Sequence, residues 1–305
     1  MTTKATFSGT YTAIVTPFLG GHLDLASFER LFATQQKLDG IVIGGTTGES
    51  PTLNQNEFET LLREALRQRK NSSLKIIAGT GSNVTEHAIA KTCLADRLGA
   101  DAMLVVAPYY NKPSPEGLFR HFSAIAQHTS KPIILYSVPS RCGIEIPVEI
   151  ITRLREQHPH IIGLKEASEQ CSRIDALKIA LGDDFHILSG NDNMTLAFMA
   201  LAACGVISVA SNLCPDAVQN IVRAMLQNHT TEARTWHQDM LPLFRDLFIE
   251  SNPVPIKHLL AQQKLITSPE VRLPLVTLTA EHARRLESTW QQVSQKLSTF
   301  AAKTS

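Results

Sequence analysis

The stretch IIGLKEAS, residues 161–168, places a lysine directly after four apolar residues. An apolar run of this length predicts a buried strand, here over residues 161–165. Lysine is seldom buried without a partner, and burial can lower its pKa by about 3–5 units. Lys165 would then hold a free amine near neutral pH, able to attack a carbonyl and form a Schiff base. The alternative is that Lys165 reaches water or pairs with Glu166 and is only structural.

Short apolar segments of the same kind recur through the first two-thirds of the chain. They cover residues 12–15, 40–44, 74–78, 102–106, 133–136, 161–165, 185–188 and 205–209. Amphipathic stretches separate most of them, and the clearest, residues 58–66, follows Asn54 and Glu57, which together predict a helix N-terminus. Eight strands alternating with helices predict an α/β fold, a (β/α)₈ TIM barrel, with a doubly wound open sheet as the alternative.

The strand pattern stops near residue 225. Apolar residues then follow a helical period through residues 236–248, and further helical segments follow NPVPIK, residues 252–257. We therefore expect a catalytic barrel over 1–225 and a C-terminal helical domain over 226–305. No low-complexity linker separates the two parts, so we expect the helical part to pack on the barrel.

The composition argues against several classes of function. The 305 residues include 29 basic and 28 acidic side chains, and a net charge of +1 speaks against binding of nucleic acid or of an acidic membrane surface. No apolar stretch approaches the roughly 18 residues of a membrane span, and the N-terminus has no signal-peptide pattern. Five scattered cysteines without a CxxC pair, and no histidine or carboxylate cluster, predict a cytoplasmic protein without disulfides or metal.

Residues suited to chemistry follow the predicted strands, at the face where barrel enzymes place their active sites. In GGTTGES, residues 44–50, a tight turn offers backbone N–H groups and the hydroxyls of Thr46 and Thr47 to a carboxylate or phosphate. The motif is neither a P-loop nor a dinucleotide fingerprint. A plain turn between strand and helix is the alternative.

Two further strand ends carry tyrosines and an arginine. In APYYN, at most one of Tyr109 and Tyr110 can face the strand-end cavity, because neighbouring side chains of an extended segment point to opposite sides. In YSVPSR, the Tyr136 phenol could move protons and the Arg141 guanidinium could bind a carboxylate. Packing and surface roles are the alternatives. A second lysine, Lys257, opens a helix outside the barrel, where we expect packing or capping instead of nucleophilic chemistry.

Taken together, these motifs resemble the pyruvate-dependent class I aldolase family that includes dihydrodipicolinate synthase and N-acetylneuraminate lyase. The resemblance covers nearly the whole chain, with TAIVTPF, GTTGES, GTG, PYYN, YxVPxR, GLKEAS, SGND, GVISV and NPxPxK in family order. It points to the synthase branch because Arg141 is present, whereas sialic acid lyases lack it. The resemblance implies that Lys165 forms a Schiff base with pyruvate. It also implies that Thr47 holds the pyruvate carboxylate and that Ile207 lines the pocket.

The resemblance further implies the second substrate and the proton path. Arg141 would bind aspartate semialdehyde, in a condensation on the diaminopimelate route to lysine. Thr46, Tyr136 and Tyr110 would form a proton relay, with Tyr110 entering the active site of a neighbouring subunit. The expected assembly is a homotetramer, a dimer of dimers, and no metal or organic cofactor is implied.

In feedback-inhibited members, the resemblance implies a lysine-binding pocket. The corresponding positions here are Ser50, Pro51, Gln55, Phe58, Asn83, His87 and Tyr109. Two histidines of that pocket are replaced by Gln55 and Phe58, and His87 replaces the glutamate that would pair with the ammonium group of the ligand. We therefore expect weak or absent inhibition by lysine.

Three other readings stay open at this point. Ser137 stands where asparagine is usual in the family motif, which leaves room for a lyase or aldolase of the same family with another aldehyde, such as an N-acetylneuraminate lyase-like enzyme. A non-catalytic barrel that binds keto acids is a second alternative, although it would be expected to lack Lys165 or Tyr136. A nucleotide-binding protein is the third, and the missing phosphate motifs argue against it.

Overall fold

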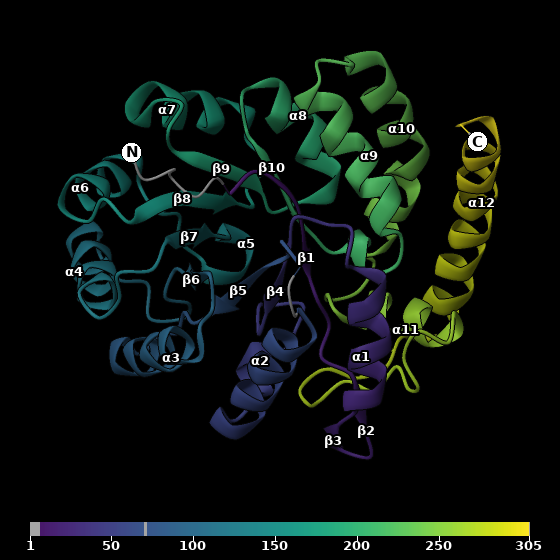
Figure 1. The fold of residues 1–305 in the computed structure, drawn as a ribbon, viewed down its shortest axis with the longest axis horizontal. Helices are drawn as coiled ribbons and strands as arrows, with labels where there is room; N and C mark the ends of the chain where they lie inside the picture. The colour runs from purple at the N-terminus through teal and green to yellow at the C-terminus, as the bar shows by residue number, and fades with distance from the viewer. Residues whose placement is uncertain (1–6, 70–71, 305) are drawn as a thin grey trace.

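In the computed structural model, which describes residues 7–69 and 72–304 and only the backbone of 299–304, eight parallel strands close into a barrel. The strand order is β1-β10-β9-β8-β7-β6-β5-β4, and helices surround the barrel on all sides (Figure 1). The strands are β1 Gly9–Ala13, β4 Gly40–Ile43, β5 Lys75–Gly79, β6 Ala102–Val106, β7 Ile133–Ser137, β8 Ile161–Glu166, β9 His186–Ser189 and β10 Gly205–Ser208. The predicted TIM barrel is confirmed, and the open sheet is not.

The helices and short elements follow the strands in alternation. The helices are α1 Leu25–Thr34, α2 Gln55–Arg69, α3 Thr85–Leu98, α4 Pro115–Ala126, α5 Pro139–Cys142, α6 Val148–Gln157, α7 Cys171–Leu181, α8 Thr195–Ala200, α9 Pro215–Leu226, α10 Thr230–Asp246, α11 Val254–Gln262 and α12 Ala280–Thr304. The short elements are the hairpin of β2 Phe18–Leu19 and β3 His22–Leu23 and the 3₁₀ turns Ser50–Thr52, Asp192–Met194 and Ala210–Asn212.

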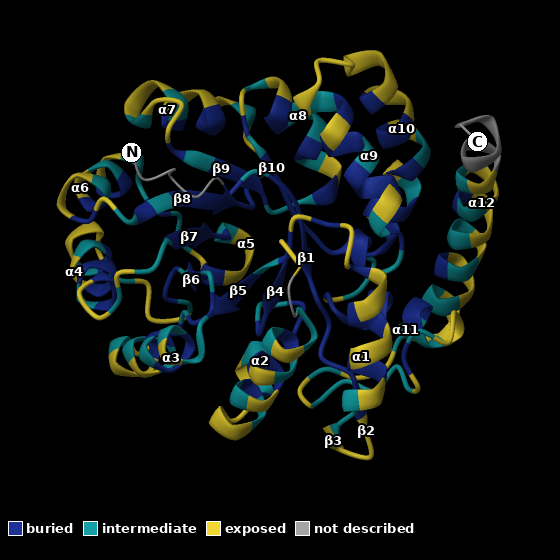
Figure 2. Ribbon diagram, in the orientation of Figure 1, coloured by how far each residue is buried: buried dark blue, intermediate teal, exposed yellow. Residues whose placement is uncertain are grey.

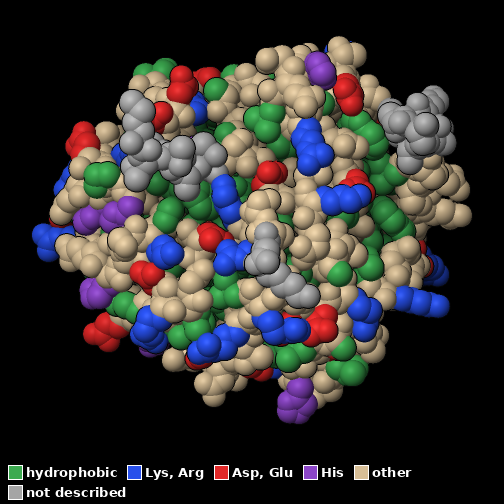
Figure 3. All heavy atoms as spheres, viewed as in Figure 1, with side chains coloured by type: hydrophobic (Ala, Val, Ile, Leu, Met, Phe, Trp, Pro, Cys, Tyr) green, Lys and Arg blue, Asp and Glu red, His purple; other side chains and the backbone are tan. Residues whose placement is uncertain are grey.

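Burial follows this architecture. The barrel strands are buried almost throughout, and the surrounding helices alternate buried and exposed residues, as Figure 2 shows. Such helices bury one apolar stripe against the sheet and leave the other face in water. On the surface seen in Figure 3, basic and acidic side chains are interspersed, as the net charge near zero leads one to expect.

The cap predicted at Asn54 and Glu57 is present. The Asn54 side chain accepts the Glu57 backbone N–H at 3.0 Å, and the Glu57 carboxylate accepts the Asn54 N–H at 3.0 Å. This reciprocal pair satisfies two N–H groups that the start of a helix would otherwise leave unbonded. It fixes where α2 leaves the turn after β4, and that turn forms part of the site described below.

The first strand begins earlier than the sequence indicates. The apolar pattern predicts residues 12–15, whereas β1 covers Gly9–Ala13 and pairs with β10 and β4. Thr12 is buried and donates to the Gln35 side chain at 2.6 Å, while Ser211 lies 2.8 Å from the same hydroxyl. Polar residues therefore belong to this strand because partners from distant segments satisfy them, which a local hydrophobic pattern does not reveal.

The C-terminal helices pack against the barrel as expected. Helix α10 contacts α9, and α12 contacts both α10 and α11 at the right edge of Figure 1. Most of the predicted apolar stripe of α10, including Trp236, Met240 and Phe244, is buried. The division into 1–225 and 226–305 stays a prediction. The chain runs from α9 to α10 through three residues, and both helices contact each other closely.

Candidate active site at the strand ends

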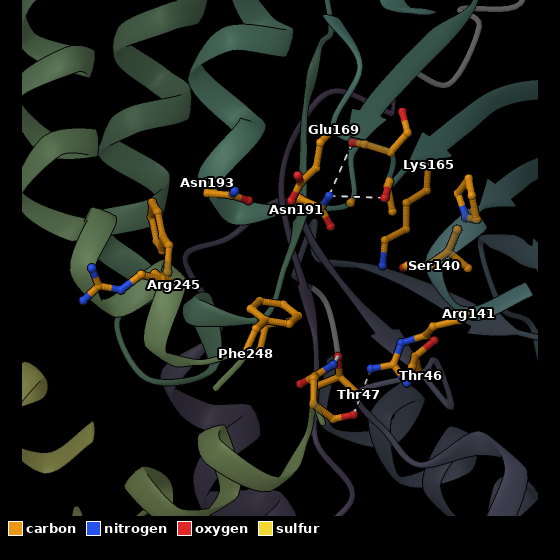
Figure 4. A pocket seen from close by; sticks show the side chains of 18 of the residues that line it. Thr46, Thr47, Ser140, Arg141, Lys165, Glu169, Asn191, Asn193, Arg245 and Phe248 are labelled. Atoms are coloured by element: carbon orange, nitrogen blue, oxygen red, sulfur yellow. Dashed lines mark hydrogen bonds between the residues drawn. The ribbon is translucent and has the colours of Figure 1, made fainter. Parts of the chain in front are cut away.

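A cavity of about 1230 Å³ opens at the carboxyl ends of the barrel strands. One wall comes from the strand ends and the turns after them, and the other comes from α10 and the segment that follows it. The strand-end wall includes Thr46, Thr47, Tyr136, Arg141, Lys165, Gly190 and Val209, and the opposite wall includes Gln238, Leu241, Phe244, Arg245, Phe248 and Asn252. In Figure 4, Lys165 and Arg141 enter from one side, and Phe248 faces them.

Lys165 lies in β8 and is only 6% exposed. Its Nζ lies 4.3 Å from the centroid of the Tyr136 ring. Burial lowers the pKa of Lys165 to about 7, an effect that the Asp192 carboxylate opposes and the Arg141 guanidinium reinforces. A free amine is therefore accessible near neutral pH, and that amine faces a cavity.

Glu166 is not the partner of this lysine. Its carboxylate accepts a hydrogen bond from Arg173 Nε at 2.6 Å and another from the Ser168 backbone N–H at 2.7 Å. Arg173 also donates to Glu145 at 2.8 Å, so Glu166 belongs to a separate buried network. The structural alternative for Lys165, an ion pair with its neighbour, is therefore wrong.

Tyr136 stands beside the lysine because β7 and β8 are paired in register at these two residues. Burial raises the pKa of the Tyr136 phenol to about 12, while a hydrogen bond with the Thr46 side chain and the Arg141 charge act in the opposite direction. The phenol is therefore protonated at neutral pH, next to an amine and a hydroxyl. Such a group can donate a proton to an atom bound at Lys165 and recover it through Thr46.

Residues 44–50 form the turn that we call the cradle turn. Gly44 has φ +65°, and a Cβ there would lie 2.9 Å from the Phe58 ring, so only glycine fits. Within the turn, the Glu49 N–H donates to the Thr46 carbonyl at 3.1 Å. Thr47 is buried, and its Oγ1 accepts a hydrogen bond from Asn252 Nδ2 at 2.9 Å. The turn thus presents two hydroxyls to the cavity in a fixed geometry suited to a carboxylate.

Arg141 lies in α5, the short helix after β7. One of its guanidinium nitrogens, Nη2, donates to the Asn252 carbonyl at 3.2 Å, and the side chain lines the cavity beside Thr46 (Figure 4). A guanidinium with donors to spare at the mouth of a cavity suits bidentate binding of a carboxylate.

The two neighbouring tyrosines lie in different surroundings. Tyr109 lines a second, smaller cavity of about 190 Å³, together with Ser50, Pro51 and Cys142. Tyr110 is 90% exposed, has φ +74°, and lines neither of these two cavities. Within one chain, the structure therefore does not bring Tyr110 to Lys165.

The other positions implied by the resemblance are more scattered. Ile207 is fully buried in β10, and Val209 lines the main cavity instead. Phe58 is buried against the cradle turn, whereas Gln55 and His87 are exposed. The carbonyl of Asn83 accepts a hydrogen bond from the Asn111 side chain at 2.9 Å.

The sequence assigns no specific role to two residues of the site, Asn252 and Asp192, although Asp192 in SGND is a possible site residue. Asn252 holds Thr47 and receives a hydrogen bond from Arg141, and its own Oδ1 is buried without a partner. Asp192 is buried, accepts the backbone N–H groups of Val209 and Ala210 at 3.0 Å through Oδ2, and has no partner for Oδ1. Both belong to quoted motifs, NPVPIK and SGND, which were the only signal available.

Two features bear on other functions. Among the residues that the structure describes, no three or more His, Cys, Asp or Glu side chains are grouped to hold a metal ion. In the same part of the chain, no helix has the length and apolar character needed to cross a membrane.

Comparison with known proteins adds the following. The sequence profile of the Dihydrodipicolinate synthetase family matches residues 6–293. The 4-hydroxy-tetrahydrodipicolinate synthase of Persephonella marina is 44% identical over 284 residues, which are 92% of this chain and 97% of that protein. The structure of the 4-hydroxy-tetrahydrodipicolinate synthase from Methylacidiphilum fumariolicum is 48% identical, with a TM-score of 0.94 over 96% of this chain and 98% of that chain. A pyruvate complex of the dihydrodipicolinate synthase from Acinetobacter baumannii is 38% identical, with a TM-score of 0.92 over 95% of this chain and 99% of that one.

Proposed function

The chain belongs to the dihydrodipicolinate synthetase family, and on this basis we propose that it condenses pyruvate with aspartate 4-semialdehyde, the 4-hydroxy-tetrahydrodipicolinate synthase reaction. This reaction lies on the diaminopimelate route to lysine. The observation that carries the proposal is the buried Lys165, with a pKa of about 7, facing the cavity beside the Tyr136 phenol. A catalytic amine that is partly deprotonated near neutral pH is what Schiff-base chemistry on a keto acid requires.

In the first half of the reaction, the Lys165 amine attacks the C2 carbonyl of pyruvate. The resulting carbinolamine loses water to give an iminium ion, and loss of a C3 proton gives the enamine. We assign the pyruvate carboxylate to the cradle turn, where Thr47 is fixed by Asn252. The pyruvate complex of the Acinetobacter baumannii relative supports this choice of first substrate.

We assign the proton transfers to Tyr136 and Thr46, because their hydrogen bond lies next to the amine that must gain and lose protons. A third member, Tyr110, would come from a second copy of the chain. Its 90% exposure and left-handed backbone fit a side chain that projects toward a partner. The proposed assembly is therefore a homo-oligomer, a homotetramer as in the sequence-based expectation.

In the second half, the enamine C3 attacks the aldehyde carbon of aspartate semialdehyde and forms the new C–C bond. The amine of that substrate then attacks the iminium carbon, which closes the ring and releases Lys165. We assign the semialdehyde carboxylate to Arg141, whose guanidinium lines the cavity near the lysine. The lysine itself serves as the electron sink, so the proposed reaction draws on no other organic group.

The alternative aldehydes gain no support from Ser137. This residue is fully buried, and its Oγ lies 3.5 Å from the Ile146 backbone N–H, as an acceptor in a weak hydrogen bond. It does not line the cavity, so its difference from the usual asparagine leaves the aldehyde side of the site unchanged. A keto-acid-binding protein without catalysis would have no need for both Lys165 and Tyr136 in this register.

Two further parts of the proposal concern regulation and location. The exposed His87 and Gln55 offer no carboxylate to an amino-acid ligand, so we propose weak or absent inhibition by lysine. Inhibition at micromolar lysine in a steady-state assay would contradict this.

We also propose a cytoplasmic location, because Cys93, Cys142, Cys171, Cys204 and Cys214 all carry free thiols, as is usual in reducing compartments.

The experiment that tests the function is chemical trapping. The chain is incubated with pyruvate and borohydride, and its intact mass and peptides are measured. We expect one reduced pyruvyl adduct, on Lys165, and turnover when aspartate semialdehyde is supplied without reductant. If the adduct forms but this aldehyde is not turned over, the assignment to Schiff-base chemistry stands and the proposed second substrate is wrong. No adduct would remove the proposed function.

A further inference from the structure

Glu49, in the cradle turn, combines an unusual backbone with a deeply buried charge. Its φ and ψ are +54° and +38°, a left-handed conformation that glycine or asparagine adopts far more readily than glutamate. Its side chain is almost completely buried. A glutamate in this position is costly in both respects, so its carboxylate must have a compensating role.

That carboxylate is bound by the C-terminal extension. Lys257 Nζ, from α11, donates to Glu49 Oε1 at 2.6 Å, and the Arg272 backbone N–H donates to Oε2 at 3.0 Å. Lys257 is fully buried and lies 4.4 Å from the centroid of the Phe18 ring. We call Glu49, Lys257 and Arg272 the Glu49 cluster. Lys257 lines neither described cavity, so it serves as a structural cation and not as a second amine for substrate.

Arg272 extends the same contact to the far side of the turn. Its Nη1 donates to the Thr52 carbonyl at 2.8 Å and to the Glu57 carboxylate at 2.7 Å. The guanidinium also lies 4.2 Å from the centroid of the Phe18 ring. The cradle turn and the start of α2 are therefore both fixed to segments more than 200 residues away along the chain, as the separations of 208 and 215 residues show.

Within the Glu49 cluster, Glu49 lies two positions along the chain from Thr47, the residue that would hold the substrate. Thr47 Oγ1 already accepts a hydrogen bond from Asn252, which belongs to the same C-terminal segment as Lys257. Because that oxygen is the acceptor, the hydroxyl proton of Thr47 is available to donate to a carboxylate. On the other side, Thr16 Oγ1 donates to the Gly48 carbonyl at 2.7 Å, so the turn is held from both faces.

We propose that Glu49 and Lys257 are positioning residues through which the C-terminal extension sets the cradle turn for the pyruvate carboxylate. This inference rests on the proposed function, because it takes pyruvate as the ligand of the turn. Neither residue touches substrate. Their ion pair holds Gly48 and Thr47 in the geometry that binds it, and small displacements of such a group cost much of its effect.

The test uses pyruvate concentration as its readout. Wild type, Glu49→Gln, Lys257→Met and the double variant are incubated with increasing pyruvate and a fixed amount of borohydride, and the Lys165 adduct is quantified. We expect the half-saturating pyruvate concentration to rise about 10- to 100-fold in each variant. At saturating pyruvate, the adduct level should stay within about threefold of wild type, because Lys165 and Tyr136 are untouched.

The double variant separates positioning from folding. Lys257→Met alone leaves the buried Glu49 carboxylate without its bonded cation, which is strongly destabilising, whereas the double variant leaves no such carboxylate. We expect the double variant to regain much of the lost thermal stability and still to need more pyruvate. Should Lys257→Met fail to fold, Glu49→Gln and the double variant carry the test.

Arg285→Met is the matched control. Arg285 Nη2 binds the buried Asp246 carboxylate at 2.9 Å and ties α12 to α10, away from the cradle turn. It should lower the melting temperature without moving the half-saturating pyruvate concentration. A wild-type half-saturation in the double variant would overturn the proposal. A shift of equal size in Arg285→Met would also overturn it. Absence of the adduct in wild type would instead refute the proposed function.

Discussion

Lys165 and Lys257 are both buried, at 6% and 0% exposure, but their surroundings are opposite. Lys257 Nζ binds the Glu49 carboxylate at 2.6 Å, outside the main cavity. Lys165 Nζ faces that cavity over a phenol ring, and the Asp192 carboxylate acts on it only at a distance. Burial lowers the pKa of both amines, but for Lys257 the directly bonded Glu49 acts in the opposite direction and stabilises the ammonium form.

The comparison shows that burial alone does not identify a reactive lysine. What distinguishes the two is the partner of the amine and the space in front of it. A paired ammonium has its donors engaged and its charge compensated, so it serves as a fixed cation. An unpaired amine beside a cavity titrates near neutral pH and can add to a carbonyl.

Removing the Lys165 amine should produce the largest effect of all. In Lys165→Met, we expect kcat/KM to fall by more than about 10,000-fold, because the nucleophile that forms the Schiff base is gone. The pyruvyl adduct should vanish from the peptide map. Lys257→Met is the comparison variant, and it should still form the Lys165 adduct at saturating pyruvate. An adduct on Lys257 in the Lys165→Met protein would break the distinction between the two lysines.

The same substitution should stabilise the fold. At pH 7 the unfolded chain carries a charged lysine, whereas the folded chain holds Lys165 with a pKa near 7. Between pH 7 and the ordinary lysine pKa, Lys165 binds more protons in the unfolded state, so its contribution to wild-type stability rises with pH, by at most about 1.4 kcal/mol per pH unit. Lys165→Met removes the cost of burying this amine, and we expect the free energy of unfolding to increase by about 2–4 kcal/mol at pH 7.

Urea unfolding at pH 6, 7 and 9 measures this gain. It should be largest at pH 6 and smaller at pH 9, because deprotonation in the unfolded chain becomes progressively easier as pH approaches the ordinary lysine pKa. Lys257→Met should change the stability in the opposite direction, since it leaves the buried Glu49 carboxylate without the cation that it binds. Equal destabilisation by both substitutions would mean that the two sites do not differ in the way described.

These two lysines also show which features of the site can be predicted from the sequence. The strand at residues 161–165, the lysine at its end and the tyrosine in the neighbouring strand follow from local patterns, because a buried strand ends in a side chain that faces the barrel mouth. The barrel itself follows from the repetition of such strands. The family resemblance then supplied substrate identity, which no local pattern contains.

What the sequence did not predict are contacts across long separations. Asn252 is hydrogen-bonded to Thr47, 205 residues away, and Lys257 to Glu49, 208 residues away. Neither residue lies on a periodic face from which its partner could be predicted. The early start of β1 was missed for the same reason, because Thr12 is satisfied by Ser211, 199 residues away. Local hydrophobicity reports burial, whereas a buried polar group needs a partner that only the fold supplies.

Arg141 should affect both the second substrate and the lysine. In Arg141→Ala, we expect kcat/KM for aspartate semialdehyde to fall about 100-fold, because charge-assisted hydrogen bonds to its carboxylate are lost. The pKa of Lys165 should rise, since the Arg141 charge lowers it. The pH midpoint of pyruvate trapping with cyanoborohydride should therefore move to higher pH.

Arg141→Lys separates these two effects. It retains the positive charge but not the planar pair of donors, so it should restore the pH midpoint and leave turnover of the semialdehyde impaired. If Arg141→Ala alters neither turnover nor the trapping midpoint, the assignment of this arginine to the second substrate is wrong.

Substitution of Asp192 should have the smallest effect of those considered. It tests most directly why the titration of Lys165 differs from that of Lys257. Asp192→Asn keeps an acceptor for the Val209 and Ala210 N–H groups but removes the negative charge that raises the pKa of the lysine. In wild type, trapping should have its midpoint near pH 7, and in the variant we expect it about one unit lower. Melting temperatures should stay close, because the backbone hydrogen bonds remain.

Two features make this outcome informative in either direction. Burial raises the pKa of Asp192 itself, while its backbone hydrogen bonds favour the charged form. A midpoint that moves down shows that the carboxylate is charged and that Lys165 titrates in its field without being paired to it. An unchanged midpoint would mean that Asp192 is neutral at pH 7. Glu49, by contrast, lies in direct contact with its lysine, so its effect on that lysine does not depend on a field acting from a distance.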